Sequence, residues 1–234
     1  MTQDVISPYR LTLQSDHLWL DDVEYELQQE LGRGKSAISW LYRRTTANST
    51  LPAQIVLKRY CQTGHQTIDF SQALAFELCS YQRLQCAGIA HPRLLAYSHE
   101  YYCLAKAFIA GELISDLLIR QGLDDRHFRP MFAMAQQLEQ HGFHIDYFPT
   151  NFVLNAQGLF YIDYEAHPYN GEWDFANWGI YYWLNRDGMR QFIATGDVRH
   201  INQPDQPKPW VTPFQRQRES LMRRLANGAS PIGK

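Results

Sequence analysis

The spacing of apolar residues changes midway along the chain, and this change constrains the fold more than any other feature. In the first half, apolar residues gather in short alternating or β-branched runs, as at 38–42 and 54–58, which is typical of strands. In the second half, longer segments such as 131–141 and the strongly apolar 173–184 indicate helices. A strand-rich half followed by a helix-rich half predicts an α+β protein with two lobes.

We expect the remaining elements to follow the same division. One helix interrupts the first half, from about residue 68 to 86, because Leu74, Leu78 and Tyr81 recur there at helical spacing. The other expected elements are strands at 18–20, 25–31, 94–97 and 101–109, a small hairpin of 152–154 with 159–162, and a final helix after the Pro-rich stretch 204–213. A hinge at 108–111 then separates an N-terminal lobe, residues 1–108, with an antiparallel sheet and one helix, from a mainly helical C-terminal lobe, residues 109–234.

The composition allows a sizeable core and excludes some classes of function. The chain has 234 residues, of which 45% are hydrophobic, and a formal net charge of -2. This balance argues against broad nucleic-acid binding, which needs a basic field. From Arg199 to the end the chain has seven basic and two acidic residues. We therefore expect a basic final helix that could meet an acidic protein partner through Arg216, Arg218, Arg223 and Arg224.

The cysteine pattern and the apolar runs indicate the cellular setting. The four cysteines form no C-x-x-C pair, which favours reduced thiols over a disulfide framework or a zinc site. The first residues hold no apolar stretch long enough for a signal peptide. No apolar run approaches the roughly 18 residues of a membrane span. We expect a cytoplasmic protein without a membrane span.

A glycine-rich turn, Gly32-Arg33-Gly34-Lys35-Ser36, follows the expected strand at 25–31. It is not a P-loop, because the position five residues before Gly34 is Gln29 rather than glycine. Two interpretations remain: a simple structural hairpin, or a hairpin whose backbone covers the phosphates of a nucleotide, where a Cβ would block close approach. The turn alone does not decide between them.

Lys58 and Glu77 bear on the choice between these two interpretations of the turn. Lys58 ends the apolar strand at 54–58, and Glu77 lies in the middle of the helix expected at 68–86. Taken singly, the lysine fits a strand-edge residue and the glutamate a solvated helix face. Kinase-like enzymes, however, carry a phosphate-binding lysine on a strand and hold it with a helical glutamate. The ordered trio makes the nucleotide-binding interpretation about as good as the structural one.

The segment His144-Ile145-Asp146-Tyr147-Phe148-Pro149-Thr150-Asn151 carries the most information. It matches H-x-D-x-x-x-x-N, in which the aspartate orients or deprotonates an acceptor hydroxyl and the asparagine holds magnesium. Asp163 follows twelve residues after Asn151, behind an apolar strand, where the second metal ligand belongs. Taken singly, His144 could be a core histidine and Asp163 a turn residue. The ordered set favours phosphoryl transfer.

These motifs resemble the protein-kinase-like superfamily, and within it the aminoglycoside phosphotransferase and choline/ethanolamine kinase branch, over residues 25 to 185. The stretch from Ile162-Asp163-Tyr164-Glu165 through Tyr169-Asn170 to Trp173–Asn177 is similar to the metal-binding signature of choline kinases. The resemblance implies the two-lobed kinase-like fold, with Ala107, Phe108 and Ile109 contacting ATP at the hinge. It also implies that His144 supports the catalytic loop and that Asp174 braces it through backbone hydrogen bonds.

The resemblance further implies ATP and Mg²⁺ as cofactors. Lys58, held by Glu77, would bind the α- and β-phosphates, and Asp146 would act on the acceptor hydroxyl. The expected phosphate cover is Gly32, Gly34, Lys35 and Ser36, and the expected metal ligands are Asn151 and Asp163.

The acceptor is expected to be a small molecule such as an amino alcohol or a sugar. Only 11 residues separate Asp163 from Asp174, and no A-P-E motif occurs, which leaves no room for a peptide-docking platform. An ammonium group could be held by the carboxylates Glu165, Glu172 and Asp187 and the aromatic residues Trp173, Trp178, Tyr181, Tyr182 and Trp183, although such aromatics equally fit a helix core.

Two alternatives to a small-molecule kinase stay open. Phe148 stands two residues after Asp146, where related kinases carry a cation that stabilises the transferred group. One alternative is a small atypical bacterial-type kinase that acts on a protein, as a Ser/Thr protein kinase, or on a lipid-linked sugar. The other is a nucleotide-binding pseudokinase.

Overall fold

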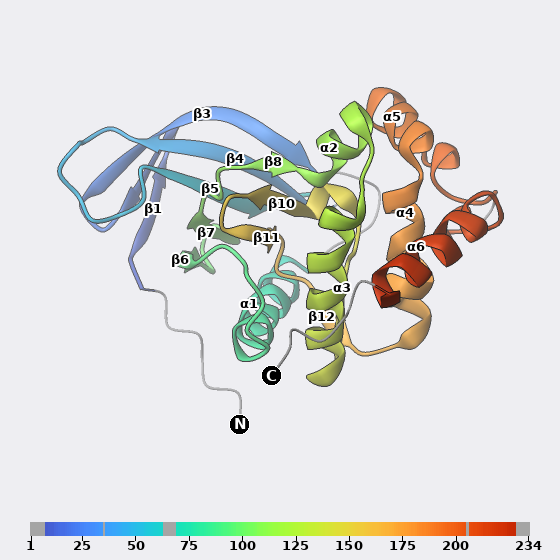
Figure 1. The fold of residues 1–234 in the computed structure, drawn as a ribbon. Coiled ribbons are helices and arrows are strands. Elements are labelled where there is room, and N and C mark those ends of the chain that lie inside the picture. The colour runs from blue at the N-terminus through green and yellow to red at the C-terminus, as the bar shows by residue number, and fades with distance from the viewer. Residues whose placement is uncertain (1–7, 35, 63–68, 205, 228–234) are drawn as a thin grey trace. The chain divides into compact units, whose positions relative to one another are not determined.

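The computed structural model describes residues 8–34, 36–62, 69–204 and 206–227 (Figure 1). The chain divides into two compact units. The N-terminal unit consists of Met1–Gln85 with His91–Ile109, and the C-terminal unit consists of Cys86–Ala90 with Ala110–Lys234. Lys35 lies outside the described residues. The fold is mixed α+β, with a large antiparallel sheet and six α-helices in the described part of the chain.

The N-terminal unit is built on a seven-stranded antiparallel sheet with the strand order β1-β2-β3-β4-β5-β7-β6 (Figure 1). Successive strands pair as neighbours from β1 to β5, so most connections are hairpins. The strands are β1 (Leu11–Gln14), β2 (His17–Leu20), β3 (Val23–Arg33), β4 (Ala37–Arg44), β5 (Gln54–Tyr60), β6 (Leu94–Ser98) and β7 (Cys103–Ala107).

The alternation of apolar residues explains the core of this sheet. Side chains of successive strand residues point to opposite faces, so every second residue can be buried. Leu18 and Leu20 on β2 and Ile55 and Leu57 on β5 follow this rule and lie in one apolar cluster with Tyr25. The strands expected at 18–20, 25–31, 38–42, 54–58 and 94–97 are confirmed.

Two details of the sheet differ from the sequence expectation. The edge strand β1 was not expected, because its four residues carry too short a pattern to stand out. The last strand, expected at 101–109, is confined to Cys103–Ala107. It begins late because Tyr102 adopts a left-handed conformation (φ 45°) in the preceding turn, which breaks the extended backbone.

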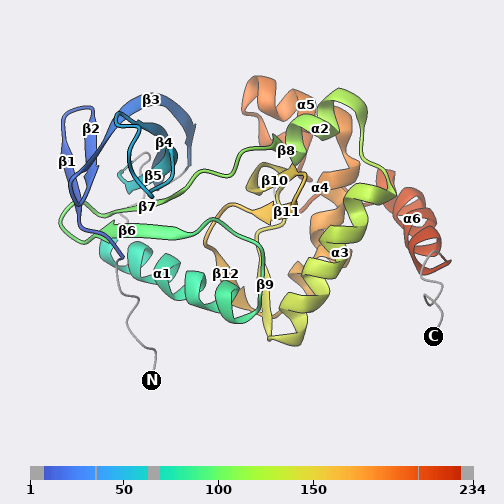
Figure 2. The same cartoon turned by 60° about the vertical axis from the view of Figure 1, so that its left-hand side comes forward.

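The helix α1 (Phe70–Cys86) confirms the helix expected near 68–86. It begins where it does because Asp69 caps it: the Asp69 Oδ1 accepts hydrogen bonds from the N–H groups of Ser71 and Gln72. Its apolar stripe is buried, and Figure 2 shows the helix below the sheet, on the side of β6. The Tyr60 hydroxyl of β5 donates to the Ala73 carbonyl, which joins helix and sheet.

Helices and short strand pairs form the C-terminal unit. Its helices are α2 (Ile114–Gln121), α3 (Asp125–Gln140), α4 (Ile180–Leu184), α5 (Arg186–Thr195) and α6 (Gln215–Asn227). Its strands are β8 (Glu112–Leu113), β9 (Phe143–Ile145), β10 (Phe152–Asn155), β11 (Gly158–Tyr161) and β12 (Ala166–Pro168). The expected hairpin is confirmed, since β10 and β11 pair antiparallel with Asn155 opposite Gly158. The helix expected at 131–141 is confirmed as part of α3.

The single buried helix expected at 173–184 is wrong in its details. A 3-10 turn, Gly171–Trp173, is followed by a π-helical turn, Phe175–Gly179, and only then by α4. Trp173 is 41% exposed, whereas Trp183 is fully buried. Gly179 explains the close packing of this segment, because a Cβ there would lie 2.4 Å from the Cβ of Tyr147.

An aromatic core holds the C-terminal unit together. The Trp183 ring lies 5.3 to 6.0 Å from the rings of Phe128, Phe152 and Phe175, at tilted or edge-on angles. Such pairs each contribute about 0.5–1.5 kcal/mol beyond area burial. This cluster brings together α3, β10, the π-helical turn and α4, which are far apart in the sequence.

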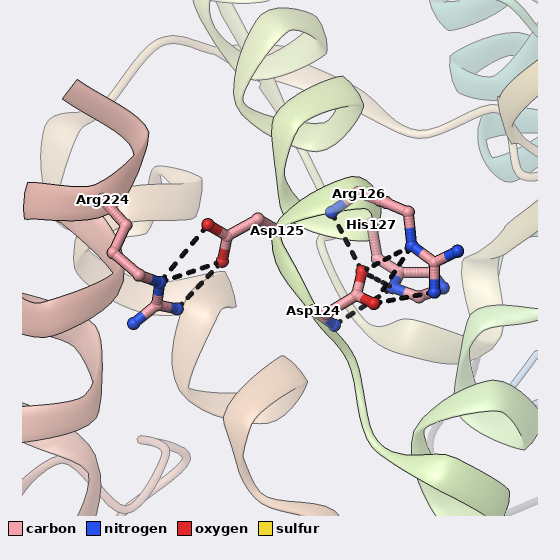
Figure 3. Close-up of polar contacts among 5 residues, drawn as sticks. All are labelled: Asp124, Asp125, Arg126, His127 and Arg224. Carbon is pink, nitrogen blue, oxygen red and sulfur yellow. Dashed lines mark hydrogen bonds and ion pairs between the residues drawn. The ribbon is translucent and has the colours of Figure 1, made fainter. Parts of the chain in front are cut away.

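The final helix α6 is basic as expected, but two of its arginines already bind residues outside the helix. Arg224 forms a side-on ion pair of 2.9 Å with Asp125 at the start of α3 (Figure 3). Next to it, Asp124 caps α3, and Arg126 lowers the pKa of Asp124 to about 2 (Figure 3). Arg218 donates to the Ala176 carbonyl, 2.7 Å away. These two arginines therefore dock the helix. Arg216 and Arg223 are exposed, and Arg223 donates to the Glu219 carbonyl within the helix.

Two further expectations concern the thiols and the membrane. All four cysteines, at positions 61, 79, 86 and 103, are free thiols. Within the described residues, no helix combines the length and the apolar character that crossing a bilayer requires.

Candidate functional site

In the N-terminal unit, Lys58 and Glu77 form an ion pair between β5 and α1. The side chains are only 16% and 8% exposed, so both charges are largely removed from water. Lys58 lies on an inner strand, between Ser39 of β4 and Leu104 of β7. It is therefore neither an edge residue nor a snorkelling surface lysine. Removing two charges from water lowers the stability of the folded state unless the geometry of the pair is excellent.

The glycine-rich turn joins β3 and β4. Gly32 lies opposite Ser39, and the Gly34 N–H donates to the Ala37 carbonyl at 2.8 Å. Neither glycine adopts positive φ, and a Cβ would meet nothing within 4 Å at Gly32 and only the Ala37 oxygen at 3.5 Å at Gly34. The hairpin itself thus does not require glycine at either position. A ligand that approaches the backbone closely would require it.

The expected hinge residues end this unit. Ala107 is the last residue of β7 and donates its N–H to the Arg93 carbonyl at 2.9 Å. Phe108 donates to the Gln54 carbonyl at 3.2 Å, and Ile109 is the last residue of the unit. All three are half-buried.

In the C-terminal unit, the segment expected as a catalytic loop follows β9 and is held by hydrogen bonds between its own residues. The Asp146 carboxylate accepts two hydrogen bonds, from the Phe148 N–H at 3.1 Å and from the Asn151 side-chain amide at 2.9 Å. The 3-10 turn Pro149–Asn151 sets the spacing that lets Asn151 reach back. Because the Asn151 Nδ2 faces Asp146, its Oδ1 is the atom that remains to bind a cation.

Several contacts hold this loop in place. The buried Trp183 donates its indole N–H to the Tyr147 carbonyl at 2.8 Å. Gly179 allows the π-helical turn to pack directly against Tyr147. The Ile162 N–H donates to the Asn151 carbonyl at 2.9 Å. This hydrogen bond places Asp163, the next residue, close to the loop. The structure thus brings Asp146, Asn151 and Asp163 together.

The electrostatics of the loop show that carboxylates converge on Asp146. The pKa of Asp146 is raised to about 6, first by desolvation and then by the negative charges of Glu165 and Asp163. The hydrogen bonds from Phe148 and Asn151 oppose this shift. Asp146 is exposed at the surface. Even so, desolvation and the neighbouring negative charges raise its pKa by more than the two hydrogen bonds lower it. Crowded carboxylates of this kind attract a proton or a cation.

The sequence indicates Glu165 as part of an acceptor surface but gives no signal for its neighbour His167. The His167 Nε2 lies 2.8 Å from the Glu165 Oε1. The His167 ring stacks on His144, opposite it in the β9–β12 pair, with centroids 5.5 Å apart. Burial and His167 lower the pKa of His144. His144 therefore supports the strand that leads into the loop, and only strand pairing reveals this contact.

Asp174 has partners other than those that the resemblance implies. Its carboxylate accepts hydrogen bonds from the Asn177 N–H at 2.7 Å and from the Tyr169 hydroxyl at 3.3 Å. Desolvation raises its pKa. In the described structure it therefore caps the π-helical turn and makes no hydrogen bond to the backbone of 144–151. It supports that segment indirectly, through the packing of the turn on Tyr147.

Aromatic side chains surround Phe148. The Phe148 ring lies 5.2 Å from the ring of Tyr182 and 5.7 Å from that of Phe192, edge-on in both cases. Asp146 raises the pKa of Tyr182, after desolvation, so this hydroxyl lies within reach of the Asp146 charge. Asp187, expected as part of a negative surface, is instead paired with Arg190 at 3.2 Å and is exposed.

The donor set fits magnesium better than a metal held by protein alone. Within the described residues, no three His, Cys, Asp or Glu side chains are placed to hold a metal ion. The Asp163 carboxylate and the Asn151 amide oxygen are hard oxygen donors. Magnesium commonly takes one or two protein ligands of this type and completes its shell with water and substrate phosphates.

Comparisons with known proteins leave the family open. No protein-family model matches the chain, and no curated protein matches it. The crystal structure of WbdD is similar to it with a TM-score of 0.48 and 20% sequence identity, over 68% of this chain and 37% of that chain. The chain thus spans little more than a third of the length of WbdD. Similarity at this level identifies neither a family nor an activity.

Proposed function

We propose that the protein is an ATP- and magnesium-dependent phosphotransferase of the two-lobed kinase-like type. The observation that carries this proposal is the arrangement around Asp146. One short segment presents a carboxylate of raised pKa, an asparagine oxygen directed away from it and Asp163 close by. Phosphoryl transfer needs an acceptor-orienting carboxylate next to oxygen ligands for magnesium.

Each group has a role that its environment supports. Asp146 would orient the acceptor hydroxyl and take its proton, and its pKa of about 6 suits a base working near neutral pH. Asn151 and Asp163 would hold magnesium, which, when bound, supplies positive charge to the transferring phosphoryl group. Lys58, fixed by Glu77, would bind the α- and β-phosphates. Gly32, Gly34, Lys35 and Ser36 would cover the phosphates, and Ala107, Phe108 and Ile109 would contact the adenine.

A small acceptor is supported by the path of the chain after Asp163. The interval to Asp174 is filled by β12 and the 3-10 turn Gly171–Trp173. These short elements leave no extended segment on which a peptide could dock. The free thiols suit a reducing compartment such as the cytoplasm.

One observation favours a second candidate, a nucleotide-binding pseudokinase. Phe148 packs between Tyr182 and Phe192 at the position where a cation would otherwise stabilise the transferred group. An enzyme without that cation loses one source of transition-state stabilisation.

The test combines binding and turnover. Calorimetry with ATP should detect binding that requires magnesium and that Asp163→Ala weakens. A panel of amino alcohols, aminoglycosides, sugars and basic proteins should then reveal the acceptor. Asp146→Asn should leave ATP affinity nearly intact and lower turnover a hundredfold or more.

The outcomes separate the candidates. The absence of ATP binding with or without magnesium would refute the proposal. Magnesium-independent binding without turnover on any acceptor would favour the pseudokinase. Transfer to basic proteins alone would favour an atypical protein kinase.

A further inference from the structure

The C-terminal unit contains an open pocket of about 690 Å³ that includes none of the residues given a role in the proposed phosphotransfer. Residues between Tyr169 and Trp178 form one wall, and Gln203, Lys208, Pro209 and Val211 contribute the other. Three of its lining residues, Glu172, Trp173 and Trp178, are among those expected from the sequence to hold an ammonium group, and Asp174 caps the π-helical turn. Pockets of about 300–1,000 Å³ are the usual size for small ligands.

Two tryptophans in tilted contact lie on one side of this pocket. The Trp173 and Trp178 rings have centroids 4.2 Å apart and planes inclined by 37°. Trp178 is half-buried. Trp173 is 41% exposed, although an indole of this size is normally buried. The pair is thus an aromatic platform that faces solvent.

The polar groups around the platform have both signs of charge. Glu172 and Lys208 both line the pocket, and neither side chain makes a hydrogen bond or ion pair with another described residue. Asn177 and Gln203, in contrast, already bond to the Gly171 and Pro209 carbonyls. The pocket therefore offers one acceptor group and one donor group beside an apolar face.

This combination suits a sugar ring better than an ammonium ion. An ammonium site needs negative charge and aromatic faces on several sides, whereas here Lys208 shares the pocket with the acidic groups. Asp174 is also occupied by Tyr169 and Asn177. A pyranose ring instead has an apolar C–H face for stacking and hydroxyls that both donate and accept hydrogen bonds.

We propose that this pocket binds a sugar ring, which stacks on Trp173 and exchanges hydrogen bonds with Glu172 and Lys208. Sugar binding at this pocket requires neither ATP nor a catalytic loop, so it can be tested independently of the phosphotransferase proposal. A single ring on one platform should bind weakly, with Kd in the millimolar range, because small ligands have few contacting atoms.

Saturation-transfer difference NMR on the full chain tests the site without nucleotide. The probes are methyl glucoside, methyl mannoside, methyl galactoside, N-acetylglucosamine and maltose, with tetramethylammonium as the cation probe. We expect saturation of ring C–H protons for at least one sugar. Trp173→Ala should weaken that binding about tenfold or more, in line with the loss of one aromatic contact.

Two further variants make the result specific. Trp19→Ala, which removes a half-buried tryptophan from β2 of the other unit, should leave sugar binding unchanged. Glu172→Gln should weaken it only a few-fold, because an amide still forms hydrogen bonds. The same change would abolish binding of a cation. If Trp173→Ala proves unstable, Lys208→Ala should still lower affinity for the sugar.

Three outcomes would overturn the proposal. In the first, no sugar shows saturation transfer. In the second, sugars bind equally well to Trp173→Ala and Lys208→Ala. In the third, tetramethylammonium binds instead of sugars, and Glu172→Gln abolishes that binding.

Discussion

The buried ion pair between Lys58 and Glu77 makes a quantitative prediction about stability. Glu77→Gln keeps the size of the side chain but removes the carboxylate that pairs with the Lys58 ammonium. Removing one partner of a buried pair costs about 3–5 kcal/mol, much of it for the charge left behind. With Lys58 still 16% exposed, the ammonium keeps some contact with water, so we expect a loss of about 3 kcal/mol from the free energy of unfolding.

Urea unfolding measures this loss. For a small domain the free energy of unfolding falls by about 1–3 kcal/mol per molar urea. The midpoint of Glu77→Gln should therefore shift down by roughly 1.5 M relative to wild type. Because two compact units need not unfold together, hydrogen exchange of β5 and α1 amides should accompany circular dichroism, so that the change is assigned to the N-terminal unit.

Matched variants separate burial from charge alone. Glu30→Gln removes a partner of the exposed 2.9 Å pair with Arg33, whose side chains are 55% and 39% exposed, and should cost at most about 1 kcal/mol. The double change Lys58→Met with Glu77→Leu should recover most of the stability, since apolar replacements of buried pairs are often neutral. The reasoning fails if Glu77→Gln unfolds at the same urea concentration as Glu30→Gln, or if the double variant is less stable than the single one.

Two further predictions concern the C-terminal unit. The pKa of Asp146, about 6 against an ordinary 3.8, means that proton binding favours the folded state; this stabilisation is complete below about pH 4 and is lost as the pH rises through 6. Asp146→Asn should therefore melt at a higher temperature than wild type at pH 7, with the difference shrinking at pH 4, and equal melting at both values would contradict the pKa. Gly179→Ala places a Cβ 2.4 Å from that of Tyr147, so it should lower the free energy of unfolding by about 1–3 kcal/mol; an unchanged urea midpoint would show that the turn can shift without cost.

Much of the fold was predictable because its signals are local. The β-branched run at 54–58, the helical spacing around Leu74 and Leu78, and the Gln157-Gly158 turn each act within a few residues of chain. Period and turn chemistry are properties of short segments, so these elements could be assigned without neighbours. The linear order of Lys58, Glu77, Asp146, Asn151 and Asp163 was likewise sufficient to nominate the candidate site.

Other features depend on contacts between distant segments. Trp173 and Trp183 look alike in an apolar stretch, but one is exposed on a pocket and the other forms the centre of the aromatic core. The π-helical turn exists where Gly179 meets Tyr147, 32 residues earlier in the chain. No local pattern encodes which side of a helix will find such a partner.

The residues alone thus predicted most of the strands and helices and nominated the candidates for chemistry. What those residues contact became known only from the folded chain. It buried the Lys58–Glu77 pair, crowded carboxylates around Asp146, assigned Asp174 to a helical turn and engaged Arg218 and Arg224 within the chain. The physical reason is that burial, pKa and pairing arise from atoms that are close in space, whereas propensity and period arise from atoms that are close along the chain.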